Sequence, residues 1–136
     1  MFSGTLDQIF ADVVDIMAAR ITLDNRLKGF YPDGTDPNDA LRLQLYPEFG
    51  GRNVGEAIAL SHSELSEGLE AIRKSVSIVA PRDDKLPEES AFAAELADNM
   101  IRDLDITGSL SLRPGRTMVR KLAFNRQRPY KHGKLM

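Results

Sequence analysis

The chain has 136 residues, with 18 Lys/Arg, 20 Asp/Glu and no cysteine. This length is sufficient for one domain, over residues 1–136, with its own hydrophobic core. The absence of cysteine excludes disulfides, thiolate catalysis and cysteine-ligated zinc sites. No apolar run is long enough to cross a bilayer and no signal-peptide pattern follows Met1, so we expect a cytoplasmic protein with no membrane partner.

The charges are distributed unevenly along the chain. Residues 1–110 hold all twenty acids against ten Lys/Arg, whereas residues 111–136 hold eight Lys/Arg and no acid. An acidic body with a basic C-terminal segment suits either a nucleic acid or a phosphate-bearing ligand held between cation sites.

The first part of the chain predicts two helices with a loop between them. Apolar residues at helical spacing over Thr5–Ile21 indicate an amphipathic core helix. Glycine and proline predict a loop over residues 27–36. Asp36 as N-cap and Pro37 at the first helical position then predict a short helix that ends before Pro47. The stripe of the first helix consists of Leu6, Ile9, Phe10, Val13, Met17 and Ile21.

A longer central helix is predicted over residues 53–74, NVGEAIALSHSELSEGLEAIRK, opened by Asn53 and Glu56 at the spacing of a capping box. Within it, Glu64 falls inside the apolar arc and Glu67 lies at the margin of that arc. An ionised carboxylate on a core-facing surface is costly unless it is paired, hydrogen-bonded or bound to a metal. The two acids therefore need an explanation. The apolar stripe consists of Val54, Ile58, Leu65, Leu69 and Ile72, with the small Ser61 and Gly68 filling its remaining positions.

Residues 75–87 predict a polar connection that lets the next helix return antiparallel. That helix is predicted over residues 88–106, with Gly108 as its stop. Glu95 and Asp98 lie one turn apart beside its apolar stripe. By position alone, two such acids are more often part of a solvated face than of a binding site.

A last helix, predicted over residues 114–128, places Lys121, Asn125 and Arg128 on one face. The basic tail from about residue 129 should be extended, or ordered only by a ligand. Because no segment shows the alternation of a strand, we predict an all-α helical bundle of four to five helices.

The two acid pairs can converge if their helices pack side by side in opposite directions. Carboxylates crowded in this way repel one another unless cations are present. The matching cation is Mg²⁺, with Mn²⁺ as the alternative, because both take oxygen ligands. Such an ion can activate a water and neutralise phosphate oxygens, and the basic face of the last helix would supply further charge for a polyphosphate.

Glu64-x-x-Glu67, followed by Glu95-x-x-Asp98, resembles the ExxE…ExxD signature of the all-α nucleoside triphosphate pyrophosphohydrolases, and of the MazG-like members in particular. The neighbouring sequence also resembles this family, and the resemblance covers most of the chain after the first helix. The matching stretches are the Lys28-Gly29-Phe30 triplet, ALSHSELSEGLEAIRK over residues 59–74, AELADNMIRDLD over residues 94–105 and KLAFNRQRPYKHGK over residues 121–134.

The resemblance implies a hydrolase that converts a nucleoside triphosphate into the monophosphate and pyrophosphate. Its metal ligands would be Glu64, Glu67, Glu95 and Asp98, with Glu64 and Glu67 as the catalytic pair and Glu67 or a neighbour helping to deprotonate the attacking water. Family members form dimers or tetramers, so a homo-oligomer with a shared site is expected. The implied phosphate-binding set is Lys121, Asn125, Arg128 and Lys131.

One departure from the family lies at residues 111–116, SLRPGR, where relatives often have acids; it leaves open where the last helix starts. A purely structural bundle whose acid pairs are surface charges is one alternative, and two other readings stay open. One is a phosphoribosyl-ATP-type pyrophosphatase, and the other is a nucleic-acid-binding helical module that uses the basic segment 113–134. Phe30 and Tyr31 could stack on a nucleobase, although packing is the more common role. His62 is interpreted as a structural histidine.

Overall fold

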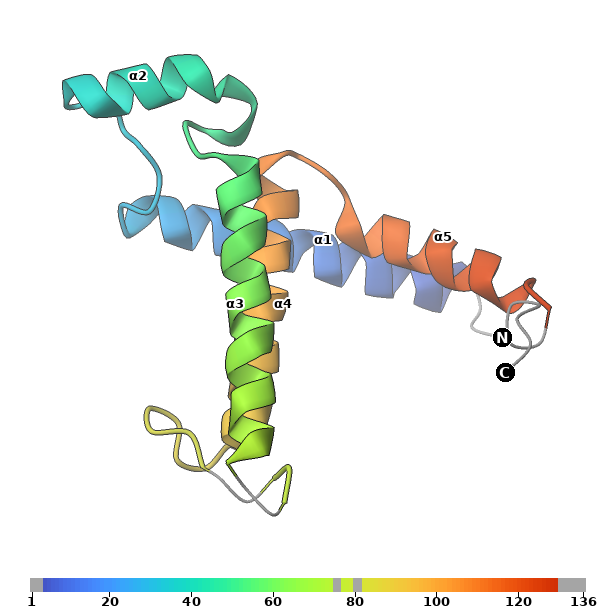
Figure 1. The fold of residues 1–136 in the computed structure, drawn as a ribbon. Coiled ribbons are helices and arrows are strands. Elements are labelled where there is room, and N and C mark those ends of the chain that lie inside the picture. The colour runs from blue at the N-terminus through green and yellow to red at the C-terminus, as the bar shows by residue number, and fades with distance from the viewer. Residues whose placement is uncertain (1–3, 75–76, 80–81, 130–136) are drawn as a thin grey trace.

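The computed structural model describes residues 4–74, 77–79 and 82–129, and over these residues the chain is all-α. The regular structure consists of α-helices and one short 3₁₀ helix, with a single isolated β-bridge between Arg82 and Ser90 (Figure 1). The elements are α1 (Gly4–Leu27), α2 (Pro37–Leu45), η1 (Pro47–Phe49), α3 (Val54–Arg73), α4 (Ala91–Ser109) and α5 (Pro114–Arg126). No helix in these ranges is apolar over a stretch long enough to span a membrane.

Side-chain caps start three of the helices. Asp36 and Asn53 cap α2 and α3 as predicted, each accepting a hydrogen bond from the backbone N–H three residues further on, at 2.9 and 3.1 Å. Ser90 does the same for α4, so this helix begins at Ala91 rather than at Glu88. The first helix was predicted too short, since α1 continues to Leu27.

The helices α3 and α4 form an antiparallel hairpin (Figure 1). The face of α3 that packs on α4 consists mostly of small residues, which lets the two helices lie close together: Ala57, Ser61, Glu64 and Gly68 are its buried members. We call this the small-residue face of α3. Of the predicted α3 stripe, the small members Ser61 and Gly68 meet α4. Its large members Ile58, Leu65 and Leu69 remain exposed.

Glycines also set how α1 meets its neighbours. A Cβ at Gly108 would lie 2.5 Å from the carbonyl oxygen of Ala18, and a Cβ at Gly115 would collide with the backbone of Ala11. The helix α1 therefore crosses α4 at Gly108 and lies against the start of α5 at Gly115 (Figure 1). Gly108 was predicted as a helix stop; that was wrong, because α4 continues to Ser109 and the glycine provides room for α1 instead.

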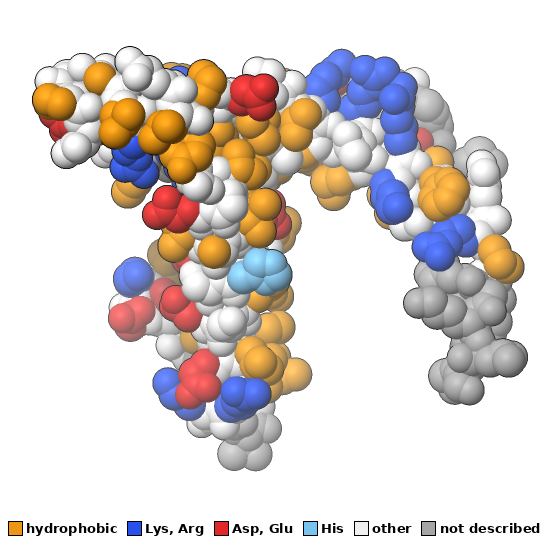
Figure 2. Space-filling view, turned by 45° about the horizontal axis from the view of Figure 1, so that its top comes forward, with side chains coloured by type: hydrophobic (Ala, Val, Ile, Leu, Met, Phe, Trp, Pro, Cys, Tyr) orange, Lys and Arg blue, Asp and Glu red, His pale blue; other side chains and the backbone are white. Residues whose placement is uncertain are grey.

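Large apolar side chains lie mainly on the outside of this single chain. The stripe predicted as the core side of α1 is open, with Ile9 54 % and Val13 56 % exposed, while Ala11 and Ala18 on the other side are buried. Figure 2 shows apolar side chains spread over the visible surface of the molecule. Contacts between helices within one chain are thus made largely by small residues, and the apolar stripes remain uncovered.

A buried polar cluster fastens the α1–α2 loop and the start of α3 to the end of α4. Asp105, 4 % exposed, accepts hydrogen bonds from Arg52 at 2.7 Å and from the hydroxyl of Tyr31 at 2.8 Å. The guanidinium groups of Arg26 and Arg52 lie 4.8 and 4.6 Å from the centre of the Tyr31 ring. Tyr31 is therefore a packing residue, whereas its neighbour Phe30 remains exposed.

Candidate metal centre

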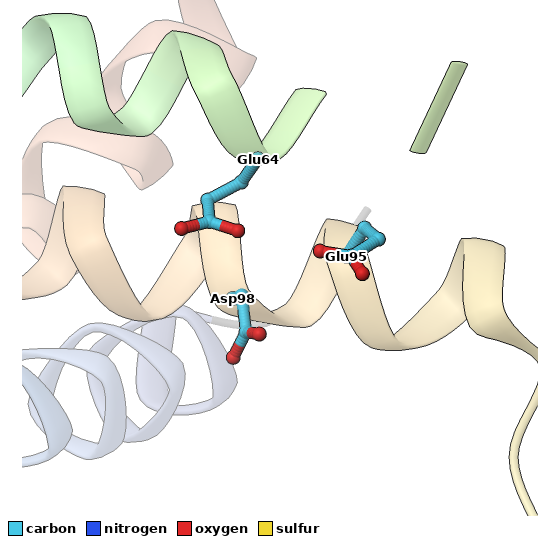
Figure 3. A group of neighbouring side chains, drawn as sticks. All are labelled: Glu64, Glu95 and Asp98. Atoms are coloured by element: carbon cyan, nitrogen blue, oxygen red, sulfur yellow. The ribbon is translucent and has the colours of Figure 1, made fainter. Parts of the chain in front are cut away.

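Three of the predicted acids come together between α3 and α4. Glu64 extends from α3 over α4, where Glu95 and Asp98 follow one another by one turn (Figure 3). Each of the three offers a carboxylate oxygen, and these oxygens all lie within 4.8 Å of one another. We call Glu64, Glu95 and Asp98 the carboxylate cluster.

The packing of α3 explains why the cluster forms. Glu64 belongs to the small-residue face, so it is carried into the interface and is only 7 % exposed. Gly68, one turn further along α3, lies opposite Glu95; a Cβ added at Gly68 would be 3.5 Å from the Cβ of Glu95. The close approach of the two helices at this point brings acids from both of them into one site.

The fourth predicted acid, Glu67, is exposed and is not a member of the cluster. It still acts on the cluster through its charge. The pKa of Glu95 is raised above its ordinary value, first by burial and then by the negative charges of Glu67, Glu64 and Asp98. A cation placed among these carboxylates would relieve that repulsion.

Arg102 is a member of the site that the sequence analysis missed. Its Nε donates a hydrogen bond to Oε1 of Glu64 at 2.5 Å, from a position one turn beyond Asp98 on α4. The spacing of four residues between Asp98 and Arg102 could have placed the arginine on the same face of α4. Which acid of α3 it would meet could not be read from that spacing.

A cavity of about 460 Å³ adjoins the cluster, and Asp98 and Arg102 contribute to its wall. This volume lies within the usual range of small-ligand sites. The wall also contains an exposed aromatic ring, two amides and two further arginines. These residues are Phe30, Asn25, Asn53, Arg42 and Arg52. Arg52 is paired with Asp105 and Asn53 caps α3. Phe30, Asn25 and Arg42 are therefore the ones that could serve a base, a sugar or a phosphate.

Comparisons with protein-family models, with curated proteins and with solved structures found no match for this chain.

The donor set of the cluster fits a hard divalent cation. All three side chains offer carboxylate oxygens, which Mg²⁺ and Mn²⁺ prefer to nitrogen or sulfur ligands. The nearest histidine along α3, His62, instead lines a separate cavity of about 200 Å³ together with Ser61 and Asp103. Glu64, Glu95 and Asp98 are thus the residues that could hold the ion.

Lys121, Asn125 and Arg128, three of the predicted phosphate-binding residues, lie in or just after α5. The helix α5 packs along α1 and extends away from the hairpin (Figure 1), so within one chain it does not face the carboxylate cluster. The ammonium of Lys121 lies 5.4 Å from the centre of the Phe124 ring. Arg128 is exposed and follows the end of α5 at Arg126, so it does not share a helical face with Lys121.

Asn125 is half-buried, and its amide oxygen has no hydrogen-bond partner within the part of the chain that the structure describes. Lys131 lies outside that part. The helix start that the SLRPGR departure left open is at Pro114, where Arg113 donates to Asp15 of α1 at 3.1 Å.

Proposed function

We propose that this chain is a divalent-metal-dependent nucleoside triphosphate pyrophosphohydrolase, with Mg²⁺ as the cofactor and Mn²⁺ as its substitute. The observation that carries the proposal is the convergence of Glu64, Glu95 and Asp98 from two antiparallel helices. Carboxylates that project toward one another from facing helices are a recurrent way to hold metal ions between helices, which supports the proposal.

The roles of the acids follow from their positions. Glu64, Glu95 and Asp98 would hold the ion, which when bound would polarise an attacking water and neutralise phosphate oxygens. Glu67 is exposed at the edge of the site, so it is free to accept a proton from that water. Attack at the α-phosphorus would release the monophosphate and pyrophosphate.

The adjoining cavity supports a nucleotide as the substrate. Phe30 is 64 % exposed and lines this cavity, where its ring could stack on a base. The amide of Asn25 could bind the polar edge of a base or a sugar hydroxyl. The cavity shares Asp98 with the carboxylate cluster, so a ligand bound in it would have its phosphates close to the ion.

A homo-oligomer is part of the proposal, as a dimer or a tetramer. The apolar stripes of α1 and α3 are exposed in one chain, and a second copy would remove them from water. The same assembly could bring α5 of one copy, with Lys121, Asn125 and Arg128, to the carboxylate cluster of another. This arrangement would explain how residues far apart in one chain serve one reaction.

The test is hydrolysis of a panel of ribo- and deoxyribonucleoside triphosphates with Mg²⁺, measuring pyrophosphate separately from phosphate. Glu64→Gln should abolish turnover without changing the helix content. Glu70→Gln is the matched control, because Glu70 lies on the same helix but is exposed and paired with Lys74 at 3.5 Å. More than a few per cent of residual activity in Glu64→Gln would refute the ligand role. Turnover of phosphoribosyl-ATP alone would favour the phosphoribosyl-ATP-type pyrophosphatase.

The placement of α5 favours a nucleic-acid-binding module as the second candidate. Residues 111–129 have six Lys/Arg and no acid, and Figure 2 shows Lys and Arg side chains gathered along one arm of the molecule. A cavity of about 570 Å³ between α1 and α5 is lined by Arg113, Arg116 and Arg120. Binding of this kind would weaken steeply with salt and would need no divalent ion.

A further inference from the structure

Arg102 neutralises the most buried acid of the carboxylate cluster. Its Nε lies 2.5 Å from Oε1 of Glu64, and the side chain of Glu64 is only 9 % exposed. A buried carboxylate without a partner is costly, so the ion pair stabilises the chain when no metal is bound. Arg102 thus occupies the carboxylate of Glu64, to which a divalent cation would also bind.

The two partners differ in their freedom to move. Glu64 is fixed within the small-residue face of α3, between two closely packed helices. The Arg102 side chain is long, 39 % exposed, and lines the 460 Å³ cavity beside the cluster. If the ion pair opens, Arg102 is the partner with room to leave.

A bound divalent cation gives a reason for the pair to open. The ion and the guanidinium have the same sign of charge and both need the Glu64 carboxylate, so each weakens the binding of the other. The cavity next to Arg102 is also where the proposed function places the nucleotide. A guanidinium turned into it could bind phosphate oxygens through two parallel hydrogen bonds.

We propose that Arg102 is a built-in counter-ion of Glu64 that gives way to the divalent cation and then turns into the adjoining cavity to bind a phosphate group of the nucleotide. This inference rests on the proposed function, since it requires both a metal and a phosphate-bearing ligand. Its consequence is coupling: metal binding frees the residue that binds phosphate, so each ligand promotes binding of the other.

The first test is calorimetric binding of Mn²⁺ to the full chain without nucleotide. Arg102→Gln removes the competing charge, so the Kd for Mn²⁺ should fall by roughly three- to tenfold. Arg20→Gln is the matched control, because it removes an arginine from an exposed ion pair with Asp24, at 3.0 Å on α1, and should leave the Kd unchanged. An unchanged or raised Kd in Arg102→Gln would overturn the inference.

The second test is binding of a non-hydrolysable nucleoside triphosphate to the Mn²⁺-saturated protein. Arg102→Gln should raise its Kd by about tenfold or more, the usual effect of losing a charge-assisted hydrogen bond. Arg102→Lys keeps a charge on Glu64 but loses the planar fork, so it should bind Mn²⁺ like the parent chain and still bind the nucleotide more weakly. Equal nucleotide affinity in all three proteins would contradict the phosphate role.

Failure of the inference can be told apart from failure of the proposed function. If the parent chain and Arg102→Gln both bind no Mn²⁺, the carboxylate cluster is not a metal site and both proposals fall. If the parent chain binds Mn²⁺ and Arg102→Gln binds it no more tightly, only the inference fails. The melting temperature in the presence of a chelator provides an independent readout, because Arg102→Gln should lower it and Mn²⁺ should restore it.

Discussion

Glu95 shows how individual side chains set the properties of the site. Burial and three neighbouring negative charges raise the pKa of its carboxyl above the ordinary value of 4.5. The folded chain therefore binds this proton more tightly than the unfolded chain does. It follows that the contribution of Glu95 to the free energy of unfolding falls as the pH rises through the interval between the unfolded and the folded pKa. Above that interval the ionised Glu95 destabilises the metal-free fold.

Two pH effects are expected from this shift. The affinity for Mn²⁺ should increase as the pH rises from 4.5 toward neutrality, because the ligand must lose its proton. At neutral pH and without metal, Glu95→Gln should raise the melting temperature while it weakens Mn²⁺ binding. Calorimetry and thermal unfolding over a pH series would measure both effects. A metal-free Glu95→Gln variant less stable than the parent chain would show that repulsion is not the main effect at this position.

At the scale of the helices, close packing depends on glycines whose roles differ. A Cβ added at Gly108 or Gly115 would collide with backbone atoms of α1, which cannot move aside, whereas a Cβ added at Gly68 would come no closer than 3.5 Å to side-chain atoms of Glu95 and Phe92. Replacement by alanine should therefore lower stability at Gly108 and Gly115 but not at Gly68, although all three glycines lie in helices.

Gly108→Ala and Gly115→Ala should each destabilise the chain by about 1–3 kcal/mol, the usual cost of overpacking a tight contact. Gly68→Ala is the control: its methyl group has room, and alanine is favoured over glycine in a helix by about 1 kcal/mol, so stability should be unchanged or higher. Urea unfolding of the three variants measures the differences. Equal stability of all three would mean that α1 does not depend on these close approaches.

The whole molecule is an open arrangement of a hairpin and a two-helix arm rather than a closed bundle (Figure 1). Its apolar stripes face outward, and the acids and the predicted phosphate ligands lie on different parts of it. An assembly in which copies cover each other's stripes would bury the apolar side chains. The same assembly could bring α5 of one copy to the carboxylate cluster of another. This expectation makes the oligomer a requirement for activity and not only for stability.

Sedimentation should therefore find a dimer or a tetramer, and Val13→Glu in the exposed stripe of α1 should shift it toward the monomer. A charge placed in an apolar interface is costly, and triphosphate hydrolysis should fall in parallel with the loss of the oligomer. Ala19→Glu, at an exposed position on the flank of the same helix, is the control. A fully active monomeric Val13→Glu variant would contradict a site shared between copies.

The local sequence was sufficient to predict that the chain is helical and which acids share a face of one helix. The side chains of Asp36 and Asn53 cap the starts of α2 and α3, and acid pairs three residues apart share a helix face. The all-α class and the antiparallel hairpin followed from such patterns and are confirmed. These features were predictable because the interactions behind them span only a few residues.

Only the tertiary structure decided which face of each helix meets which neighbour. Periodicity showed that α1 and α3 have apolar stripes, but small residues allow closer contact within one chain, so the large members of the stripes stay open. The same packing makes Gly108 a crossing point rather than a helix stop, pairs Arg102 with Glu64, and directs α5 away from the carboxylates. Each of these depends on shape matching between segments far apart in sequence, which no local pattern encodes.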